Sequence, residues 1–254
     1  MKGKAVTLSF ELSALSVTMD IKLYLQEKKE MVDAALERYF SSRPASEEGM
    51  NFLDLLHKAI RHSLFDGGKR IRPILSIAAF EAVGGKGDKV LPFACGLEMI
   101  HTYSLIHDDL PAIDNDDYRR GKPTCHKLFG EAMGILAGDA LLTEAFKLMT
   151  NRNLHEGLFR DERLILEIIN EVAQAAGIFG MIGGQVLDIE SEGKETDFPT
   201  LQYIHTHKTG ALILASVRAG VKLGLANEET LKAFTRYGEG IGLAFQIVDD
   251  ILNV

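Results

Sequence analysis

The stretch SLIHDDLPAIDNDDYRRGKPT, residues 104–124, gathers five aspartates and places two arginines directly behind them. The apolar residues before it recur at helical spacing, and Pro111 disfavours continuation of that helix. Asp108 and Asp109 are therefore predicted at a helix C-terminus, where the helix dipole disfavours negative charge. A hard divalent cation would offset this cost, since Mg²⁺ binds one or two carboxylates and completes its shell with water and phosphate oxygens. A solvated acidic loop is the simpler alternative for this stretch taken alone.

Outside this stretch, apolar residues recur at intervals of three and four, which is typical of helices. Breaks rich in Gly, Pro and polar residues separate the helical runs, and no alternating strand pattern or fixed-period repeat divides the chain after residue 20. The expected fold is one all-α domain over 19–254, preceded by a flexible extension over 1–18. The clearest helices are predicted at roughly 73–83, 89–109, 131–150, 162–180, 201–206, 210–224 and 229–252.

Composition excludes several classes of protein. The formal net charge of −8 argues against a nucleic-acid partner, because phosphate backbones are held by broad basic surfaces. The longest uncharged run, 173–187, is shorter than the roughly 20 residues that a membrane span needs. Cys95 and Cys125 show no metal-binding spacing, so they are predicted to be buried thiols in a reducing compartment such as the cytoplasm.

A second acidic cluster follows in FQIVDDILN, residues 245–253, where Asp249 and Asn253 lie one helical turn apart. Two such clusters could hold a bridging anion through several metal ions. An EF-hand counted from Asp114 fails, because Tyr118 and Arg119 stand where an oxygen ligand and Gly are needed. A histidine–aspartate phosphohydrolase is a rival reading of the doublet at 107–108, although it leaves the arginines unexplained.

Basic residues form two candidate anion sites. GGKRIRP, residues 67–73, places Lys69, Arg70 and Arg72 before a helix that could begin at Pro73, although it lacks the pattern of a Walker P-loop. HKTG, residues 207–210, adds a lysine and a threonine hydroxyl at another helix start. One metal-bound and one purely basic site predict two different phosphorylated substrates and electrostatic rather than covalent chemistry.

Six motifs follow one another along the chain: GGKRIRP, HTYSLIHDDLPAIDNDDYRRGKPTCH, GEAMGILAGDALL, GMIGGQVLDI, HKTGAL and FQIVDDILN. In this order they resemble the trans-isoprenyl diphosphate synthases, and among them the short-chain bacterial farnesyl diphosphate synthases. The resemblance covers about 40–254 and implies a helical bundle around a deep central apolar cavity, usually as a homodimer. The implied activity is condensation of isopentenyl diphosphate with dimethylallyl or geranyl diphosphate to farnesyl diphosphate, in the cytoplasm.

The resemblance also implies residue roles. Three Mg²⁺ ions, for which Mn²⁺ can substitute, would be bound by Asp108, Asp114 and Asp249. The allylic diphosphate would contact Arg119, Lys208, Thr209 and Gln246. Isopentenyl diphosphate would be held by Lys69, Arg72, His101 and Arg120. Gln185 and Asp188 would line the cavity. The catalytic set is Asp108, Asp109, Asp114, Lys208 and Asp249.

Product length is expected to depend on the cavity depth below the first aspartate. Tyr103 lies five residues before Asp108, or about 7.5 Å along a helix. In the family an aromatic residue at this place forms a floor that favours the C15 product. An ideal helical wheel instead places Ser104 beneath Asp108, so both residues are candidates, and an ordinary core aromatic is the alternative for Tyr103.

The sequence departs from the family pattern at two places. Asn253 replaces the last aspartate of the second motif, and the sequence ends at Val254 without the family's C-terminal helices. Three alternatives to a farnesyl diphosphate synthase therefore remain: a geranylgeranyl diphosphate synthase, an inactive truncated homologue that acts as a binding subunit, and a class I terpene cyclase. The cyclase would need no second substrate site.

Overall fold

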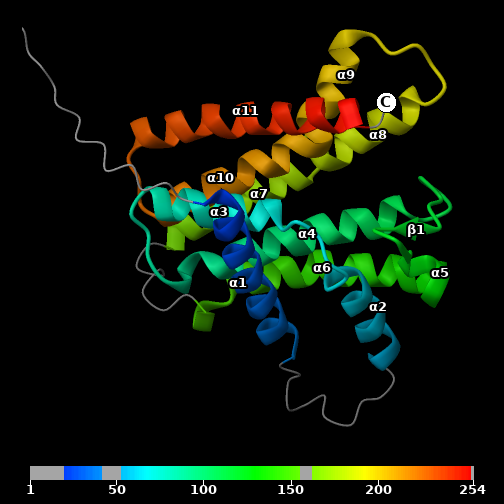
Figure 1. The fold of residues 1–254 in the computed structure, drawn as a ribbon, viewed down its shortest axis with the longest axis horizontal. Coiled ribbons are helices and arrows are strands. Elements are labelled where there is room, and N and C mark those ends of the chain that lie inside the picture. The colour runs from blue at the N-terminus through cyan, green and yellow to red at the C-terminus, as the bar shows by residue number, and fades with distance from the viewer. Residues whose placement is uncertain (1–19, 42–52, 155–161, 253–254) are drawn as a thin grey trace, which may run out of the picture.

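The computed structural model describes residues 20–41, 53–154 and 162–252, which are helical almost throughout (Figure 1). The expected extension, 1–18, and Asn253 lie outside these ranges. The elements are α1 (Ile21–Ser41), α2 (Asp54–Leu64), α3 (Ile71–Ala82), η3 (Asp88–Val90), α4 (Leu91–Asp108), β1 (Tyr118–Arg119), β2 (Lys122–Pro123), α5 (Cys125–Phe129), α6 (Glu131–Thr150), η4 (Arg152–Leu154), α7 (Glu162–Ala176), α8 (Met181–Ser191), α9 (Phe198–Ile204), η5 (His205–Gly210), α10 (Ala211–Leu223) and α11 (Glu228–Leu252).

The all-α class is confirmed, with α4 as the central helix. Its residues are buried on nearly every side, as expected for a helix without a continuous polar face. It packs against α6 and α3, while α10 joins α3, α7 and α11. Figure 1 shows α4 and α6 side by side, with α10 and α11 on one side of the pair and α1 and α2 on the other. The buried helix α4 thus carries the acidic motif to one end of the bundle, where the loop that follows is largely exposed (Figure 1).

Small residues let α6 approach α4 closely. An added Cβ at Gly138 would stand 2.1 Å from Nε2 of His107, and one at Gly96 would stand 3.0 Å from Cγ of Met149. These distances are shorter than normal packing contacts, so a side chain at either position would displace the neighbouring side chain. Gly138 therefore leaves room for His107 at the end of α4 where the acidic motif begins, and Gly96 leaves room for Met149 nearer the start of α4.

Several predicted boundaries are confirmed and two are wrong. The helices over 131–150 and up to Asp108 are found as predicted. The helix predicted over 162–180 instead ends at Ala176, and a turn at 177–180 leads into α8. At Gly180 a Cβ would lie 2.1 Å from the carbonyl oxygen of Ala175, so the turn depends on glycine. The third helix begins at Ile71, before Pro73, because proline is tolerated in a first turn.

One run, Glu162–Ser191, is long and apolar enough to cross a bilayer by length and composition, and 33% of an apolar 18-residue window within it is buried. The turn at 177–180 divides this run into α7 and α8. Core helices of globular proteins meet the same criteria, so the run gives only weak support to a membrane span.

Candidate active site

The first acidic motif lies where α4 ends, as the sequence predicts. The amide of Asp114 donates to the carbonyl oxygen of Asp108 at 2.8 Å, which folds the following loop back over the helix end. Burial raises the pKa of Asp108 to about 6, against the opposing effect of Lys208. Burial also raises the pKa of Asp114. Both carboxylates are therefore costly to ionise in the protein alone, and an added cation would stabilise them.

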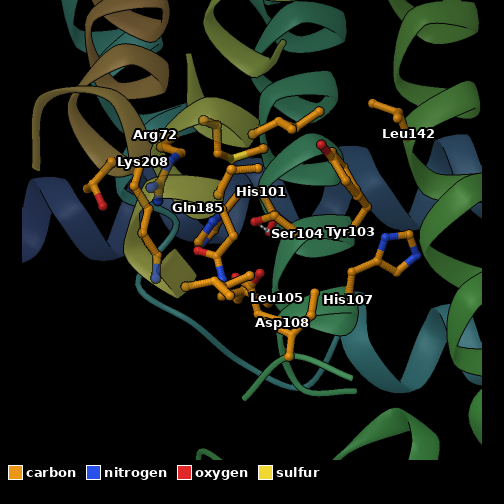
Figure 2. A pocket seen from close by; sticks show the side chains of 16 residues that line it. Arg72, His101, Tyr103, Ser104, Leu105, His107, Asp108, Leu142, Gln185 and Lys208 are labelled. Atoms are coloured by element: carbon orange, nitrogen blue, oxygen red, sulfur yellow. Dashed lines mark hydrogen bonds between the residues drawn. The ribbon is translucent and has the colours of Figure 1, made fainter. Parts of the chain in front are cut away.

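A hollow of about 470 Å³ opens beside this helix end, with walls from α4, α6, α8 and η5. Figure 2 shows Asp108 at one end, while the ring of Tyr103 and the side chain of Leu142 lie toward the other. Both amide atoms of Gln185 are buried, and neither has a hydrogen-bond partner within the described ranges. A buried amide without a partner is costly, so a ligand or water at this position would stabilise it. The hollow suits an elongated apolar molecule with a polar head near Asp108.

Both chain-length candidates face this hollow. Tyr103 and Ser104 line it, and the Ser104 hydroxyl donates to the carbonyl oxygen of His101 at 2.9 Å. The Tyr103 ring points away from Asp108 in Figure 2. Its hydroxyl is buried, and burial is the main cause that raises its pKa to about 12. The tyrosine is thus placed to limit the depth of the hollow, whereas the serine lies along its wall.

Lys208 and Thr209 reach the hollow from η5, a single π-helical turn between α9 and α10. Such turns widen the backbone and often occur at functional sites. The Lys208 ammonium pairs with Asp188 at 2.5 Å, so this aspartate positions the lysine. An added Cβ at Gly184 would stand 2.2 Å from the Lys208 backbone nitrogen, which shows how closely α8 approaches η5. Gly184, the last glycine of GMIGGQ, therefore determines how closely the backbone of Lys208 can approach α8.

A second hollow of about 530 Å³ is lined largely by charged residues. Lys69 and Arg120 line this hollow, and Arg72 and His101 line both hollows. Burial lowers the pKa of Arg72 to about 10, and its Nε has no hydrogen-bond partner among the described residues. Burial, and then the nearby arginines, lower the pKa of His101 well below its ordinary value, so it is neutral at physiological pH. An anion bound here would compensate the buried guanidinium.

The two arginines of the acidic stretch lie in a short hairpin, and each has a distinct partner. Arg119 donates from Nε to Asp109 at 2.7 Å and lies 3.7 Å from Asp116. Arg120, at the hairpin turn with φ of 54°, donates to the Gly67 carbonyl oxygen at 3.0 Å. A Cβ at Gly68 would lie 2.8 Å from Nη1 of Arg120, so glycine leaves room for this guanidinium.

Arg70 of GGKRIRP also lines the basic hollow, but protein partners already engage its guanidinium. Its guanidinium is buried and donates to Glu98 at 2.7 Å, to Asp33 at 2.8 Å and to the carbonyl oxygen of Leu64 at 2.6 Å. These contacts fix the loop onto α1 and α4. The tertiary partners come from distant segments, so the motif alone could not distinguish this arginine from Arg72.

The last part of α11 lies near the basic hollow. Phe245 lines that hollow, Gln246 is half-buried, and Gly242 contacts Gly210 of η5, where an added Cβ would stand 3.1 Å away. Asp249 lies in α11, although its side chain is outside the described part of the structure. The packing of α11 on η5 brings the second acidic motif to the side of the bundle that carries Lys208.

Among the described side chains, no group of three His, Cys, Asp or Glu residues converges as a ready metal site. The donor set at the helix end consists of carboxylate oxygens whose pKa values are raised by burial, as for Asp108 and Asp114. Mg²⁺ accepts this arrangement, since it needs few protein ligands and prefers hard oxygen donors. The residues present therefore fit a magnesium–diphosphate ligand better than a metal held by protein alone.

Several residues that line the hollow were not predicted, and two of them lie close to Tyr103 or to the closed end. Leu142 of α6 lies at its far end, and His107 lies beside the Tyr103 ring. The segment GEAMGILAGDALL contains an apolar residue at nearly every helical position, so no pattern marked Leu142. For His107 the only signal was its place one residue before Asp108, a doublet that also fits a histidine–aspartate phosphohydrolase. Its Nε2 instead bonds the Ile135 carbonyl oxygen at 3.0 Å.

Comparison with characterised proteins gives consistent matches. A geranylgeranyl diphosphate synthase of Cyanophora paradoxa is 47% identical over 241 residues, which cover 94% of this chain and 76% of that protein. A farnesyl diphosphate synthase of Geobacillus stearothermophilus is 47% identical over 240 residues, covering 93% and 76%. A dimethylallyltranstransferase of Fischerella ambigua is 48% identical over 238 residues, covering 93% of this chain but only 65% of that protein.

Solved structures agree with these matches. The fold is similar to an FPP/GFPP synthase of Zymomonas mobilis, with a TM-score of 0.83 and 36% identity over 91% of this chain and 81% of that chain. A geranyltransferase of Legionella pneumophila gives a TM-score of 0.81 at 36% identity, covering 92% and 79%. The model of the polyprenyl synthetase family matches residues 53–254. The chain therefore belongs to the polyprenyl synthetase family.

Proposed function

We propose that the protein is a trans-prenyltransferase that condenses isopentenyl diphosphate with dimethylallyl or geranyl diphosphate, with farnesyl diphosphate as its main product. The observation that carries this proposal is the pair of hollows that share Arg72 and His101. One hollow is elongated and mainly apolar, and the other is basic. Two diphosphates bound in these hollows would meet at the shared residues, as a condensation reaction requires.

The described contacts support a division of the two diphosphates between the hollows. The allylic diphosphate is assigned to Lys208 and Thr209 on η5, because its apolar tail then extends toward Tyr103. Arg119, whose charge acts on Asp108, and Gln246 of α11 complete the assigned set. Isopentenyl diphosphate is assigned to the basic hollow, whose anion-binding residues are Lys69, Arg72, His101 and Arg120. In this assignment Asp109 acts through Arg119, whose guanidinium it holds.

Divalent ions fit the acidic end of this arrangement. When bound, three Mg²⁺ ions, or Mn²⁺ in their place, would stabilise the growing negative charge on the departing diphosphate. Asp108 and Asp114 would hold them from α4 and the following loop, and Asp249 would hold them from α11. The raised pKa of Asp108, about 6, supports this assignment, because a cation would restore the ionised form.

The chemistry assigned to the chain is electrostatic. The allylic C–O bond breaks and its electron pair leaves with the diphosphate, whose charge Lys208 and Arg119 stabilise. The double bond of isopentenyl diphosphate then forms the new C–C bond, and the proton that is lost passes to the departed diphosphate. The apolar walls exclude water, which would otherwise capture the carbocation. Neutral His101 lies between the two diphosphates without adding a further positive charge.

The assignment of a C15 product depends on the closed end of the hollow. Named relatives of similar identity include both a farnesyl and a geranylgeranyl diphosphate synthase. The Tyr103 ring and Leu142 lie at the end away from Asp108, which supports the shorter of these products. Geranylgeranyl diphosphate is the alternative product, and an inactive binding subunit is the alternative to an enzyme.

Two further assignments accompany the activity. Ile135 and Leu136 are 46% and 51% exposed on α6, and such apolar residues support a homodimer, which analytical ultracentrifugation would detect. Cys95 and Cys125 are buried free thiols, which supports a reducing compartment such as the cytoplasm.

The activity is tested by incubating the protein and labelled isopentenyl diphosphate with Mg²⁺ and, in separate reactions, dimethylallyl or geranyl diphosphate. We expect farnesyl diphosphate from both reactions and none with EDTA. Binding without turnover would instead support the inactive subunit. A cyclic hydrocarbon formed from farnesyl diphosphate alone would support a terpene cyclase, which the basic second hollow disfavours.

A further inference from the structure

His107 occupies an unusual place between α4 and α6. Its imidazole lines the apolar hollow, and its Nε2 bonds the carbonyl oxygen of Ile135 at 3.0 Å. It lies against the backbone of Gly138, where any added Cβ would stand 2.1 Å from Nε2 and 2.5 Å from Cδ2. Glycine is therefore required at this position of α6 if the ring is to keep its place.

The same imidazole supports the Tyr103 ring. The two residues lie one turn apart on α4, and their rings meet edge to face with centroids 5.7 Å apart and an interplanar angle of 80°. The Tyr103 hydroxyl is buried, and it has no hydrogen-bond partner within the described ranges. No polar contact therefore holds the phenol ring in place, so its position depends on packing, and His107 is its aromatic neighbour.

We propose that His107, seated on Gly138, is a positioning residue that sets the depth of the hollow and thereby the length of the prenyl product. The inference rests on the proposed prenyltransferase activity and deepens it. His107 touches the ring that closes the hollow and is anchored to the opposite helix. Removing the imidazole gives the phenol ring space to move aside, which deepens the hollow. Displacing the imidazole from α6 moves it into the hollow that it lines, which shortens the space.

The two directions give a sharp test. In His107→Ala the ratio of C20 to C15 product is expected to rise about tenfold, a change typical of one or two methylene groups in an apolar pocket. In Gly138→Ala the C10 intermediate is expected to accumulate from dimethylallyl diphosphate, because the displaced ring hinders the next addition. In the double variant the added methyl group meets no imidazole, so Gly138→Ala is expected to have no further effect in the His107→Ala background.

Products are measured with isopentenyl diphosphate, Mg²⁺ and either dimethylallyl or geranyl diphosphate, then dephosphorylated and separated by chain length. Thermal melting is recorded for each variant, because a purely structural role would lower stability without moving the product ratio. If Gly138→Ala fails to fold, His107→Ala alone decides. Unchanged product ratios in folded single variants, or an equal effect of Gly138→Ala with and without the imidazole, would overturn the inference. Wild-type protein that forms no prenyl product would overturn the proposed function itself.

Discussion

Asp108→Asn is expected to stabilise the metal-free protein while abolishing its activity. Burial raises the pKa of Asp108 to about 6 from an ordinary value of 3.8. This difference corresponds to about 3 kcal/mol at 1.36 kcal/mol per pH unit. Since the hollow admits some water, the expected gain is about 1–2 kcal/mol. For a domain of this size that gain raises the melting temperature by about 3–6 °C.

The pH dependence follows from the sign of the change. A raised carboxyl pKa means that the folded state binds the proton more tightly than the unfolded state, so ionisation destabilises the fold as pH rises from about 4 to 6. Above about pH 7 the penalty is complete, and below about pH 4 it is absent. Asp108→Asn removes the penalty, so its advantage should be full at pH 8 and should vanish near pH 4.

The assay is thermal unfolding followed by circular dichroism in EDTA at several pH values, with condensation activity measured in parallel. The matched control is Asp88→Asn in η3, an exposed residue that lines neither hollow and whose substitution should change stability by less than about 0.5 kcal/mol. Adding Mg²⁺ and diphosphate should stabilise the wild type more than Asp108→Asn. A variant that is no more stable than the wild type at pH 8, or equally more stable at every pH, would refute the reasoning.

Three further predictions concern other parts of the structure. Gly184→Ala places a methyl group 2.2 Å from the backbone nitrogen of Lys208 and is expected to lower kcat/KM about 100-fold by displacing the lysine. Gly240→Ala, where an added Cβ would meet nothing within 4 Å, is the kinetic control. Arg70→Met leaves Glu98 buried without its partner at 2.7 Å and should cost about 3–5 kcal/mol in urea unfolding, whereas the exposed Arg61→Met should cost less than about 1 kcal/mol. Tyr103→Ala should shift the product from C15 toward C20, as chromatography of the dephosphorylated products would show. An unchanged C15 product would mean that Tyr103 does not limit the depth of the hollow.

The sequence predicted those parts of the fold that local rules determine. Helical spacing and Pro111 located the end of α4 at Asp108, and an unbroken apolar period gave the bounds of α6. The turn between α7 and α8 was missed, because its glycines stand inside an apolar run that reads as one helix. Only the close approach of Gly180 to the Ala175 carbonyl oxygen shows why the chain turns there.

The candidate site was predictable in its motifs and less so in its contacts. The acidic stretch, HKTG and Arg72 were identified from charge and spacing, and the structure places them around two adjoining hollows. Arg70 and Arg72 are two residues apart in one motif. Only contacts with distant segments, such as the bond from Arg70 to Glu98, distinguish the two side chains. His107 and Leu142 depend on the packing of α6 against α4, which no single segment encodes.

The central claim is that one protomer binds two diphosphates at once, in hollows that meet at Arg72 and His101. It is tested most directly by calorimetric titration of isopentenyl diphosphate into protein already saturated with Mg²⁺ and geranyl S-thiolodiphosphate, an unreactive allylic analogue. We predict one isopentenyl diphosphate bound per chain in the presence of the analogue, and weakened binding in Arg72→Met. Competition between the two ligands for a single site would contradict it.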